Sequence, residues 1–340
     1  MNFVVRPFDR SEDIPAFVRL RREIEDVDRT GNDTSEAAAV STLDWPGHDP
    51  ARDRWTAWTE ADTGAMAGYS FVWAQSPERS IVYATVRPDL RRRGIGGRLL
   101  EASLMRSAGM GVTHATSAVE ASNTAGAAFL ASRGFSRAGE NRFYVADADT
   151  DAPEPTWPPG YSVRDFASVG DLHILAGALN RSYGDMWGHR ENTPGAVDPE
   201  YLANELEAHP ELRDPRGIFI VFAPDGSVSG VVTAVRRPSG PGREPDLVVD
   251  SPGVVPCHRH LGLQRHLVLT AMRWLRAGGS SPVTLETFGD SDEAFSIYED
   301  LGFELQARYI DHRRPLTRVL PGDASGNAGD GCMLTEDDGF

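Results

Sequence analysis

The chain contains no lysine, and all 34 of its basic residues are arginine. It has only two cysteines, Cys257 and Cys332, which exclude a disulfide framework and have no spacing typical of metal ligands. No apolar run approaches the roughly 20 residues that a membrane-spanning helix needs. The sequence is therefore typical of neither a disulfide-rich protein nor a helical membrane protein. We also expect no bound metal.

Positive charge is also scarce relative to negative charge, because 34 Arg stand against 50 Asp and Glu, a net charge of −16. Residues 1–150 hold 18 Arg and 21 Asp or Glu, net −3, whereas residues 151–340 hold 16 and 29, net −13. An acidic second half would repel a nucleic-acid backbone. It is compatible with a cationic amine substrate and equally with ordinary solubility.

The beginning of the chain lacks the pattern of a signal peptide, since Asn2, Phe3 and Val4 lead directly into an alternating strand pattern. A length of 340 residues predicts about two domains, and a hydrophobic content of 40% is enough for two cores. We therefore expect a soluble, cytoplasmic, two-domain protein.

One segment rich in arginine and glycine carries most of the functional information. Residues 86–100 predict the end of a strand, a turn and the start of a helix. This arrangement directs backbone N–H groups and a positive helix end toward one point, which suits a pyrophosphate. The order R-x-x-G-x-G is neither the P-loop nor the dinucleotide fingerprint, and an ordinary surface turn is the alternative. The residues expected to bind are Val86, Arg91, Arg92, Arg93, Gly94, Ile95, Gly96, Gly97 and Arg98.

This segment resembles the acyl-CoA pyrophosphate loop of the GNAT superfamily of N-acyltransferases. The resemblance implies an α/β fold with a mixed sheet. It also implies acetyl-CoA or another acyl-CoA as a substrate, and transfer of the acyl group to an amine. Any side chain at Gly94 or Gly96 would keep the phosphates away from the backbone.

A second copy of the pattern follows at a constant offset of 168 residues, and it ends in Gly302 and Phe303 where the first copy has Gly134 and Phe135. Its expected binding residues are Val254, Arg259, Gly262, Leu263 and Gln264. Such an offset indicates one supersecondary unit used twice. The sequence therefore predicts two tandem GNAT folds, an architecture that resembles the mycothiol-synthase type.

The repeat and the composition together predict the domain boundaries. We expect a first GNAT domain over 1–146 and a second over 160–316. The acidic, proline-rich segment 147–159 is expected to link them, with few packed contacts across it. Residues 317–340 are rich in Gly and Asp and predict a disordered tail.

The two copies differ at the positions that carry the family's chemistry. The GNAT resemblance implies a tyrosine four residues before the final Gly-Phe, which protonates the leaving thiolate, and an asparagine seven residues earlier, which holds the pantetheine. The first copy has Asn123 but Leu130 at the tyrosine position, so Tyr83 or water would have to replace the acid. The second copy has Tyr298, but Ser291 replaces the asparagine and Gln264 replaces the second loop glycine.

The general base is harder to place from the sequence. Asp250 is the candidate, because regular alternation would put its side chain on the same strand face as Val254. Glu286 and Glu78 are further candidates, and each could equally be a solvated surface carboxylate. His258, His260 and His266 near the second loop lack a carboxylate or thiolate set for a metal. Asp185 and Trp187 lie where GNAT folds form the acceptor wall, although a packed loop is also consistent with them.

The leading hypothesis is an enzyme that transfers an acyl group from acyl-CoA to the amine of a small molecule, and that amine could be cationic. The first domain would bind CoA, and the second would supply Tyr298 as general acid. A CoA-binding pseudoenzyme or interaction module is the main alternative, since neither copy is complete. A transferase that takes its acyl group from a carrier or an aminoacyl-tRNA is a third possibility. The sequence specifies neither the acceptor nor the oligomeric state.

Overall fold

The computed structural model describes residues 2–45, 47–59, 65–74, 78–184, 197–208, 214–237, 244–279, 281–287 and 292–316. By its internal contacts the chain divides into two compact units. The first unit comprises Met1–Ala115 and Pro315–Phe340, and the second comprises Thr116–Arg314. The predicted domain boundaries at 146 and 160 remain a prediction.

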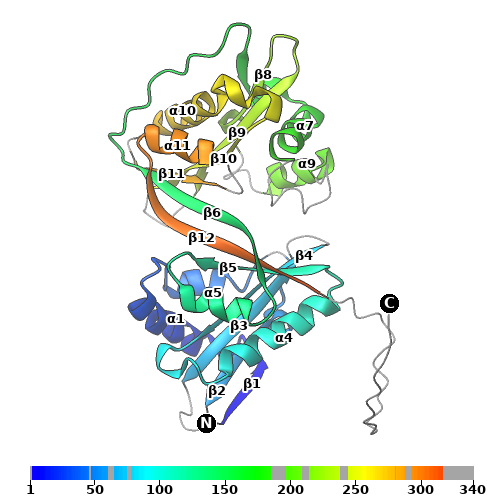
Figure 1. Cartoon of the computed structure of the whole chain (residues 1–340), viewed down its shortest axis with the longest axis vertical. Helices are drawn as coiled ribbons and strands as arrows, with labels where there is room; N and C mark the ends of the chain where they lie inside the picture. Colours follow the sequence, from blue (N-terminus) through cyan, green and yellow to red (C-terminus); the bar gives the residue numbers. More distant parts are fainter. Residues whose placement is uncertain are drawn as a thin grey trace, which may run out of the picture. The chain divides into compact units, whose positions relative to one another are not determined.

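The first unit is an antiparallel sheet with strand order β1-β2-β3-β4 and helices on both faces (Figure 1). Gly68 and Ser70 of β3 lie against Leu99 of α4, while Tyr69 of β3 packs against Phe17 of α1. Since neighbouring residues of a strand face opposite ways, α4 and α1 cover opposite faces. The elements are β1 (Phe3–Pro7), α1 (Ile14–Asp28), α2 (Glu36–Ser41), α3 (Pro50–Asp53), β2 (Arg54–Thr59), β3 (Met66–Ala74), β4 (Arg79–Val86), η1 (Pro88–Leu90) and α4 (Ile95–Gly109).

The strands of the second unit follow the order β5-β12-β6-β11-β10-β9-β8-β7. The strands are β5 (His114–Glu120), β6 (Ser136–Ala146), β7 (Ser162–Asp165), β8 (Ile218–Phe222), β9 (Val228–Arg237), β10 (Asp246–Val254), β11 (Val283–Glu286) and β12 (Glu304–Pro315). The helices are α5 (Thr124–Ala131), α6 (Phe166–Val169), α7 (Leu172–Tyr183), α9 (Pro199–Ala208), α10 (Leu263–Arg276) and α11 (Asp292–Asp300), with the 3₁₀ turns η2 (Pro215–Gly217) and η3 (Pro256–Leu261).

The final strands of the two sequence repeats are exchanged within this unit. Strand β6 ends the first repeat, but it pairs antiparallel with β11 and β12 of the second. Strand β12 ends the second repeat and lies between β5 and β6, as the adjacent ribbons in Figure 1 show. The expectation that few contacts cross 147–159 is therefore wrong, because strands from both sides of this segment share one ladder.

The starts of two helices are fixed by local contacts. Gly170 adopts a left-handed φ of 64° and ends α6, and Asp171 then caps α7. Asp13, the residue before α1, makes no side-chain cap and binds the Arg6 guanidinium at 2.6 Å.

Candidate functional site

The two predicted loops have the same backbone geometry. In each, a strand is followed by a 3₁₀ turn, a glycine and a long helix: β4, η1, Gly94 and α4 in the first, and β10, η3, Gly262 and α10 in the second. Gly94 has φ of 86° and Gly262 has φ of 73°, a left-handed conformation that favours glycine. Neither helix has a side-chain cap, so no side chain occupies the N–H groups at its start. In α4 the Gly97 and Arg98 N–H groups donate to the Gly94 carbonyl, which leaves those of Ile95 and Gly96 for an anion.

Two equivalent arginines stabilise these loops from within. The Arg91 Nε donates to the Val86 carbonyl at 3.2 Å, and the Arg259 Nε donates to the Val254 carbonyl at 3.0 Å. Arg91 also binds both carboxylate oxygens of Asp28, at 2.8 and 2.6 Å, which raises the pKa of its guanidinium. This arginine therefore anchors its loop to the end of α1.

The remaining predicted residues of the first loop divide into exposed and buried groups. Arg92, Arg93 and Arg98 are exposed, and they are the side chains that can add positive charge around a phosphate. Ile95 is buried and packs in a cluster with Leu99. Leu263 is its buried counterpart in the second loop. The apolar residues of both loops thus seat the helix on the sheet.

Asn123 caps helix α5. Its Oδ1 accepts a hydrogen bond from the Gly126 backbone N–H at 2.8 Å, so the predicted pantetheine ligand begins a helix. Leu130, at the tyrosine position of the same helix, is 4% exposed. An apolar, buried side chain at this point supplies no proton.

Gln264 and Tyr298 are brought together in the second unit. The Gln264 Nε2 donates to the Pro252 carbonyl and to the Tyr298 hydroxyl, both at 2.7 Å. Tyr298 is 0% exposed, and its ring meets that of Tyr144 edge to face with centroids 5.9 Å apart. Gln264 thus connects the predicted second phosphate loop with the predicted general acid, two features that the sequence does not link.

The candidate bases Asp250 and Glu286 lie opposite each other on the parallel strands β10 and β11. Burial raises the pKa of Glu286, and the neighbouring Asp250 raises it further against the opposing effect of Arg237. A bulge between Asp250 and Gly253 inserts one residue. The expectation that Asp250 and Val254 share a strand face is therefore wrong.

The histidines near the second loop have separate partners. His258 Nδ1 lies 2.9 Å from the Tyr161 hydroxyl, and His266 packs against Trp157 with centroids 5.5 Å apart. Within the part of the chain that the structure describes, no group of three or more His, Cys, Asp or Glu side chains could hold a metal ion. Asp185, Trp187 and Ser291 lie outside the described residues, as does the predicted tail 317–340.

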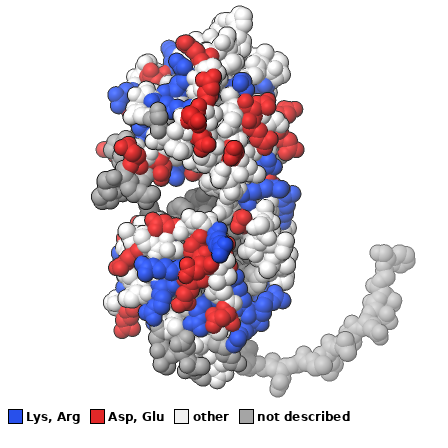
Figure 2. Space-filling model, turned by 90° about the vertical axis from the view of Figure 1, so that its left-hand side faces the viewer, with Lys and Arg blue, Asp and Glu red and all other residues white. Residues whose placement is uncertain are grey.

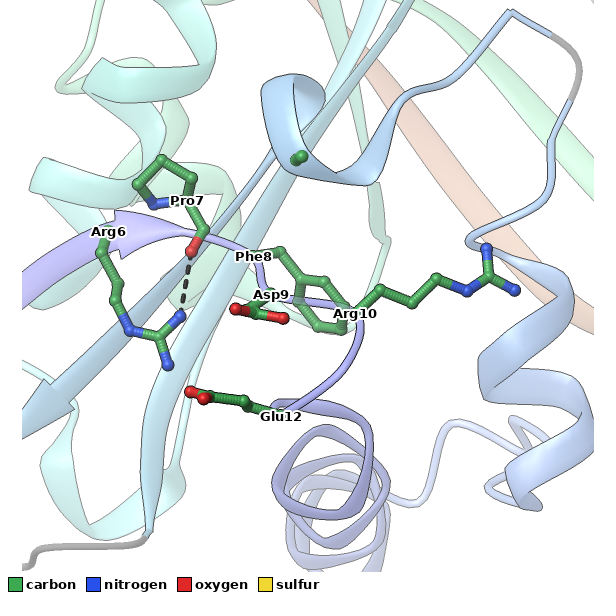
Figure 3. Close-up of a pocket in the computed structure, with 7 residues that line it drawn as sticks. Arg6, Pro7, Phe8, Asp9, Arg10 and Glu12 are labelled. Atoms are coloured by element: carbon green, nitrogen blue, oxygen red, sulfur yellow. Dashed lines mark hydrogen bonds between the residues drawn. The ribbon is translucent and has the colours of Figure 1, made fainter.

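A recess of about 460 Å³ lies beside the start of α1 in the first unit (Figure 3). Arg6 and Glu12 border it, but Arg6 already binds Asp13. Arg10, which also borders it, binds Asp44 at 2.5 Å. Because both arginines that border it are paired within the protein, this recess offers no unpaired cation to an anionic ligand.

Charge on the surface follows the same pattern of local pairing. On the face in Figure 2, arginine and acidic side chains lie intermixed. One such group in the second unit centres on Glu140, whose carboxylate binds Arg142 at 2.6 Å and Arg308 at 2.7 Å. These two arginines lower the pKa of Glu140 to about 2. No described helix is both long and apolar enough to cross a bilayer.

One group of side chains in the first unit was not predicted from the sequence. Tyr69, Phe71 and Trp73 alternate along β3 on the face toward α1, and the fully buried Arg54 lies among them. The period of two in these aromatic residues was the available signal. It does not reveal the buried arginine, whose position depends on the pairing of β2 with β3.

Comparison with known proteins places these features in context. The profile of the Acetyltransferase (GNAT) family matches residues 18–135 and 179–303. A mycothiol acetyltransferase of Saccharomonospora viridis is 30% identical over 258 residues, which cover 72% of this chain and 78% of the relative. A mycothiol acetyltransferase of Saccharopolyspora erythraea is 29% identical over 252 residues, which cover 71% of this chain and 79% of the relative.

Solved structures agree at the level of the fold. A GCN5-related N-acetyltransferase from Sphaerobacter thermophilus superposes with a TM-score of 0.74 at 21% identity, covering 92% of this chain and 95% of that one. A tandem GNAT protein from the clavulanic acid biosynthesis pathway superposes with a TM-score of 0.62 at 19% identity. The superposition covers 92% of this chain and 98% of that protein. The tandem fold predicted from the internal repeat is thereby confirmed.

Proposed function

Because the chain belongs to the GNAT acetyltransferase family, we propose that it transfers the acetyl group of acetyl-CoA to the amine of a small molecule. The amine nitrogen would attack the thioester carbonyl and form a tetrahedral intermediate. Collapse would break the carbon–sulfur bond, leaving an amide and the CoA thiolate. The reaction needs one group to accept a proton from the ammonium and one to protonate the thiolate.

The repeated loop is the single observation that carries this proposal. Left-handed Gly94 and Gly262 each precede a helix without a side-chain cap, and an arginine holds each loop to the preceding strand. This geometry offers fixed N–H donors to a pyrophosphate. Arg92, Arg93 and Arg98 favour the first loop as the site for CoA, since the second has Gln264 in place of a glycine.

For the acid and base we propose residues of the second unit. Tyr298 occupies the family's proton-donor position, and its hydroxyl already belongs to a polar contact with Gln264. Glu286 and Asp250 form a pair of neighbouring carboxylates, and burial raises the pKa of Glu286 above its ordinary value, which makes its carboxylate a stronger base. The negative charge of Asp250 would add to the effect of burial on that pKa.

One observation favours the pseudoenzyme as a second candidate. Tyr298 is fully buried and its hydroxyl is engaged by Gln264, while Leu130 stands at the equivalent position of the first repeat. If Gln264 does not move, neither repeat presents a free tyrosine hydroxyl. CoA binding without turnover would then be the function.

Two measurements on the full chain separate these candidates. Mass spectrometry of the purified protein under native conditions would detect retained CoA. Release of free thiol from acetyl-CoA would then be followed across a panel of primary amines. Since the relatives are named mycothiol acetyltransferases, a mycothiol skeleton with a free amine belongs in that panel. Binding with amine-dependent thiol release supports the transferase, and binding without release with any amine supports the pseudoenzyme.

A further inference from the structure

Four aromatic side chains form a cluster on the α1 side of the sheet in the first unit. Tyr69 and Phe71 of β3 adjoin Tyr83 of β4, with centroids 5.8 and 5.4 Å from the Tyr83 ring. Trp45, in the chain after α2, meets Phe71 edge to face at 5.3 Å. We call these four residues the aromatic cluster. Trp45, Phe71 and Tyr83 each remain partly exposed, so the cluster is a surface and not a closed core.

A buried cation lies beside this cluster. Arg54 is only 1% exposed. Its Cζ lies 5.2 Å from the ring centroid of Phe71 and 5.2 Å from that of Phe17. Its Nη2 donates to the carbonyl and, at 3.4 Å, to the hydroxyl of Thr42. Its Nε is buried without a hydrogen-bond partner among the described residues. Burial lowers the pKa of Arg54 to about 10, which still leaves it charged at neutral pH.

A second arginine reaches the same place from α1. The Arg21 Cζ lies 5.8 Å from the Phe17 centroid, and its Nη2 donates to the Asp33 carbonyl at 2.7 Å. Its Nη1 is also buried and has no partner among the described residues. Arg21 is near enough to lower the pKa of Arg54 further, so two like charges share one region.

No described acidic side chain pairs with either arginine. Asp53 precedes Arg54 in the chain, but its carboxylate binds Arg106 at 2.7 Å. Asp28 is occupied by Arg91. The pKa of His48 is lowered, because burial and the charge of Arg54 outweigh the opposing effect of the hydrogen bond between its Nδ1 and the Val72 carbonyl. Two partly desolvated cations without a counter-ion are costly, and such a site in a native protein calls for an anion.

We propose that Arg21, Arg54 and the aromatic cluster form a binding site for a small carboxylate with a flat, apolar body. Arg54 Nε and Arg21 Nη1 are two unpartnered donors on guanidinium groups that both lie against the Phe17 ring, and a carboxylate could accept a hydrogen bond from each of them. The rings of Trp45, Phe71 and Tyr83 offer apolar faces on which a planar group can stack. The proposal does not rest on acetyl transfer, and it gives the first unit a ligand besides the one expected at the CoA loop.

The first test measures binding to the full chain by calorimetry. The probes are benzoate, phenylacetate and indole-3-acetate, with benzamide as the neutral match for benzoate and phenyl phosphate as a dianionic alternative. We expect at least one carboxylate to bind and benzamide to bind much more weakly. The proposal is overturned if none of the three carboxylates binds. It is also overturned if phenyl phosphate binds more tightly than every carboxylate.

The second test locates the site with charge-removing variants. We expect Arg54→Met and Arg21→Met each to weaken carboxylate binding by about 10- to 100-fold, the effect of losing one charge-assisted hydrogen bond. Arg22→Met, on the exposed side of the same helix as Arg21, is the matched control and should bind as the parent does. Equal binding by Arg21→Met and Arg22→Met would contradict the proposal even if Arg54→Met failed to fold.

Stability supplies an independent readout. Without ligand, Arg54→Met should melt at the same temperature as the parent or higher, because the substitution removes a buried charge that lacks a counter-ion. A carboxylate that binds should raise the melting temperature of the parent and not that of Arg54→Met. A large loss of stability in Arg54→Met, with the carboxylate still raising its melting temperature, would show that Arg54 is purely structural.

Discussion

The Gln264 side-chain amide joins the Pro252 carbonyl to the Tyr298 hydroxyl, with both hydrogen bonds 2.7 Å long. The residue that replaces a phosphate-loop glycine is thus turned inward toward the expected acid. Its amide spans from the bulged end of β10 to α11. One hydrogen bond therefore joins the predicted second loop to the expected acid.

Gln264→Gly should open the second loop to phosphate and remove two hydrogen bonds. We expect tighter CoA binding, with calorimetric stoichiometry rising toward two per chain, and a loss of stability of about 1–3 kcal/mol. Gln264→Leu is the matched control, because it loses the amide but keeps the bulk. If Leu and Gly variants bind CoA alike, the steric argument for the second loop is wrong.

Tyr298→Phe should lower kcat by roughly 10²- to 10⁴-fold if the hydroxyl protonates the leaving thiolate. CoA affinity should stay unchanged, because the ring and its packing remain. Tyr144→Phe removes another buried hydroxyl next to Tyr298 and should leave the rate intact. A normal rate in Tyr298→Phe would assign protonation to the first repeat or to water.

Gly96→Glu should abolish CoA binding at the first loop, since it places a bulky negative charge beside the start of α4. Met105→Glu adds the same charge to an exposed position of the same helix, where Met105 is 72% exposed, and should bind CoA normally. Both variants should keep the parent's circular dichroism spectrum. Undiminished affinity in Gly96→Glu would contradict the assignment of this loop.

Glu286→Gln should raise the melting temperature at neutral pH, by no more than about 2–4 °C. The folded protein raises the pKa of Glu286 above its unfolded value of 4.5, so folding is penalised once the unfolded chain deprotonates. The penalty grows as pH rises from 4.5 to the folded pKa and is then constant. Melting curves of parent and variant should therefore converge below about pH 4, and Glu299→Gln, at an exposed position of α11, serves as control.

The fragment 160–340 should not fold alone, because β11 and β12 would both lose their ladder with β6. Coexpression with 1–159 should restore a soluble complex, as judged by size-exclusion chromatography and circular dichroism. A soluble 160–340 fragment that unfolds cooperatively would show that the exchanged strand is dispensable.

The repeated order of strands and helices could be predicted from the sequence, because hydrophobic periodicity and turn residues are local signals. Both loops and their glycines could be placed because a left-handed φ before a helix demands glycine at Gly94 and Gly262. The exchange of β6 and β12 could not be found this way, because either strand pattern fits either partner. The contact between Gln264 and Tyr298 was missed for a similar reason, since it depends on how α10 and α11 pack.

Strand exchange also has a consequence for how the protein is made. Strands β5 and β6 leave the ribosome long before β12, which supplies the Arg308 carbonyl that accepts from the Ala121 N–H at 2.7 Å. At 5–20 residues per second, the roughly 160 residues between β6 and β12 take about 8–30 s to synthesise. Because β11 begins only at Val283, β6 lacks both partner strands for most of that interval. Its Arg137, Glu140 and Arg142 are the kind of charged side chains that discourage edge-to-edge aggregation while the strand waits for its partner.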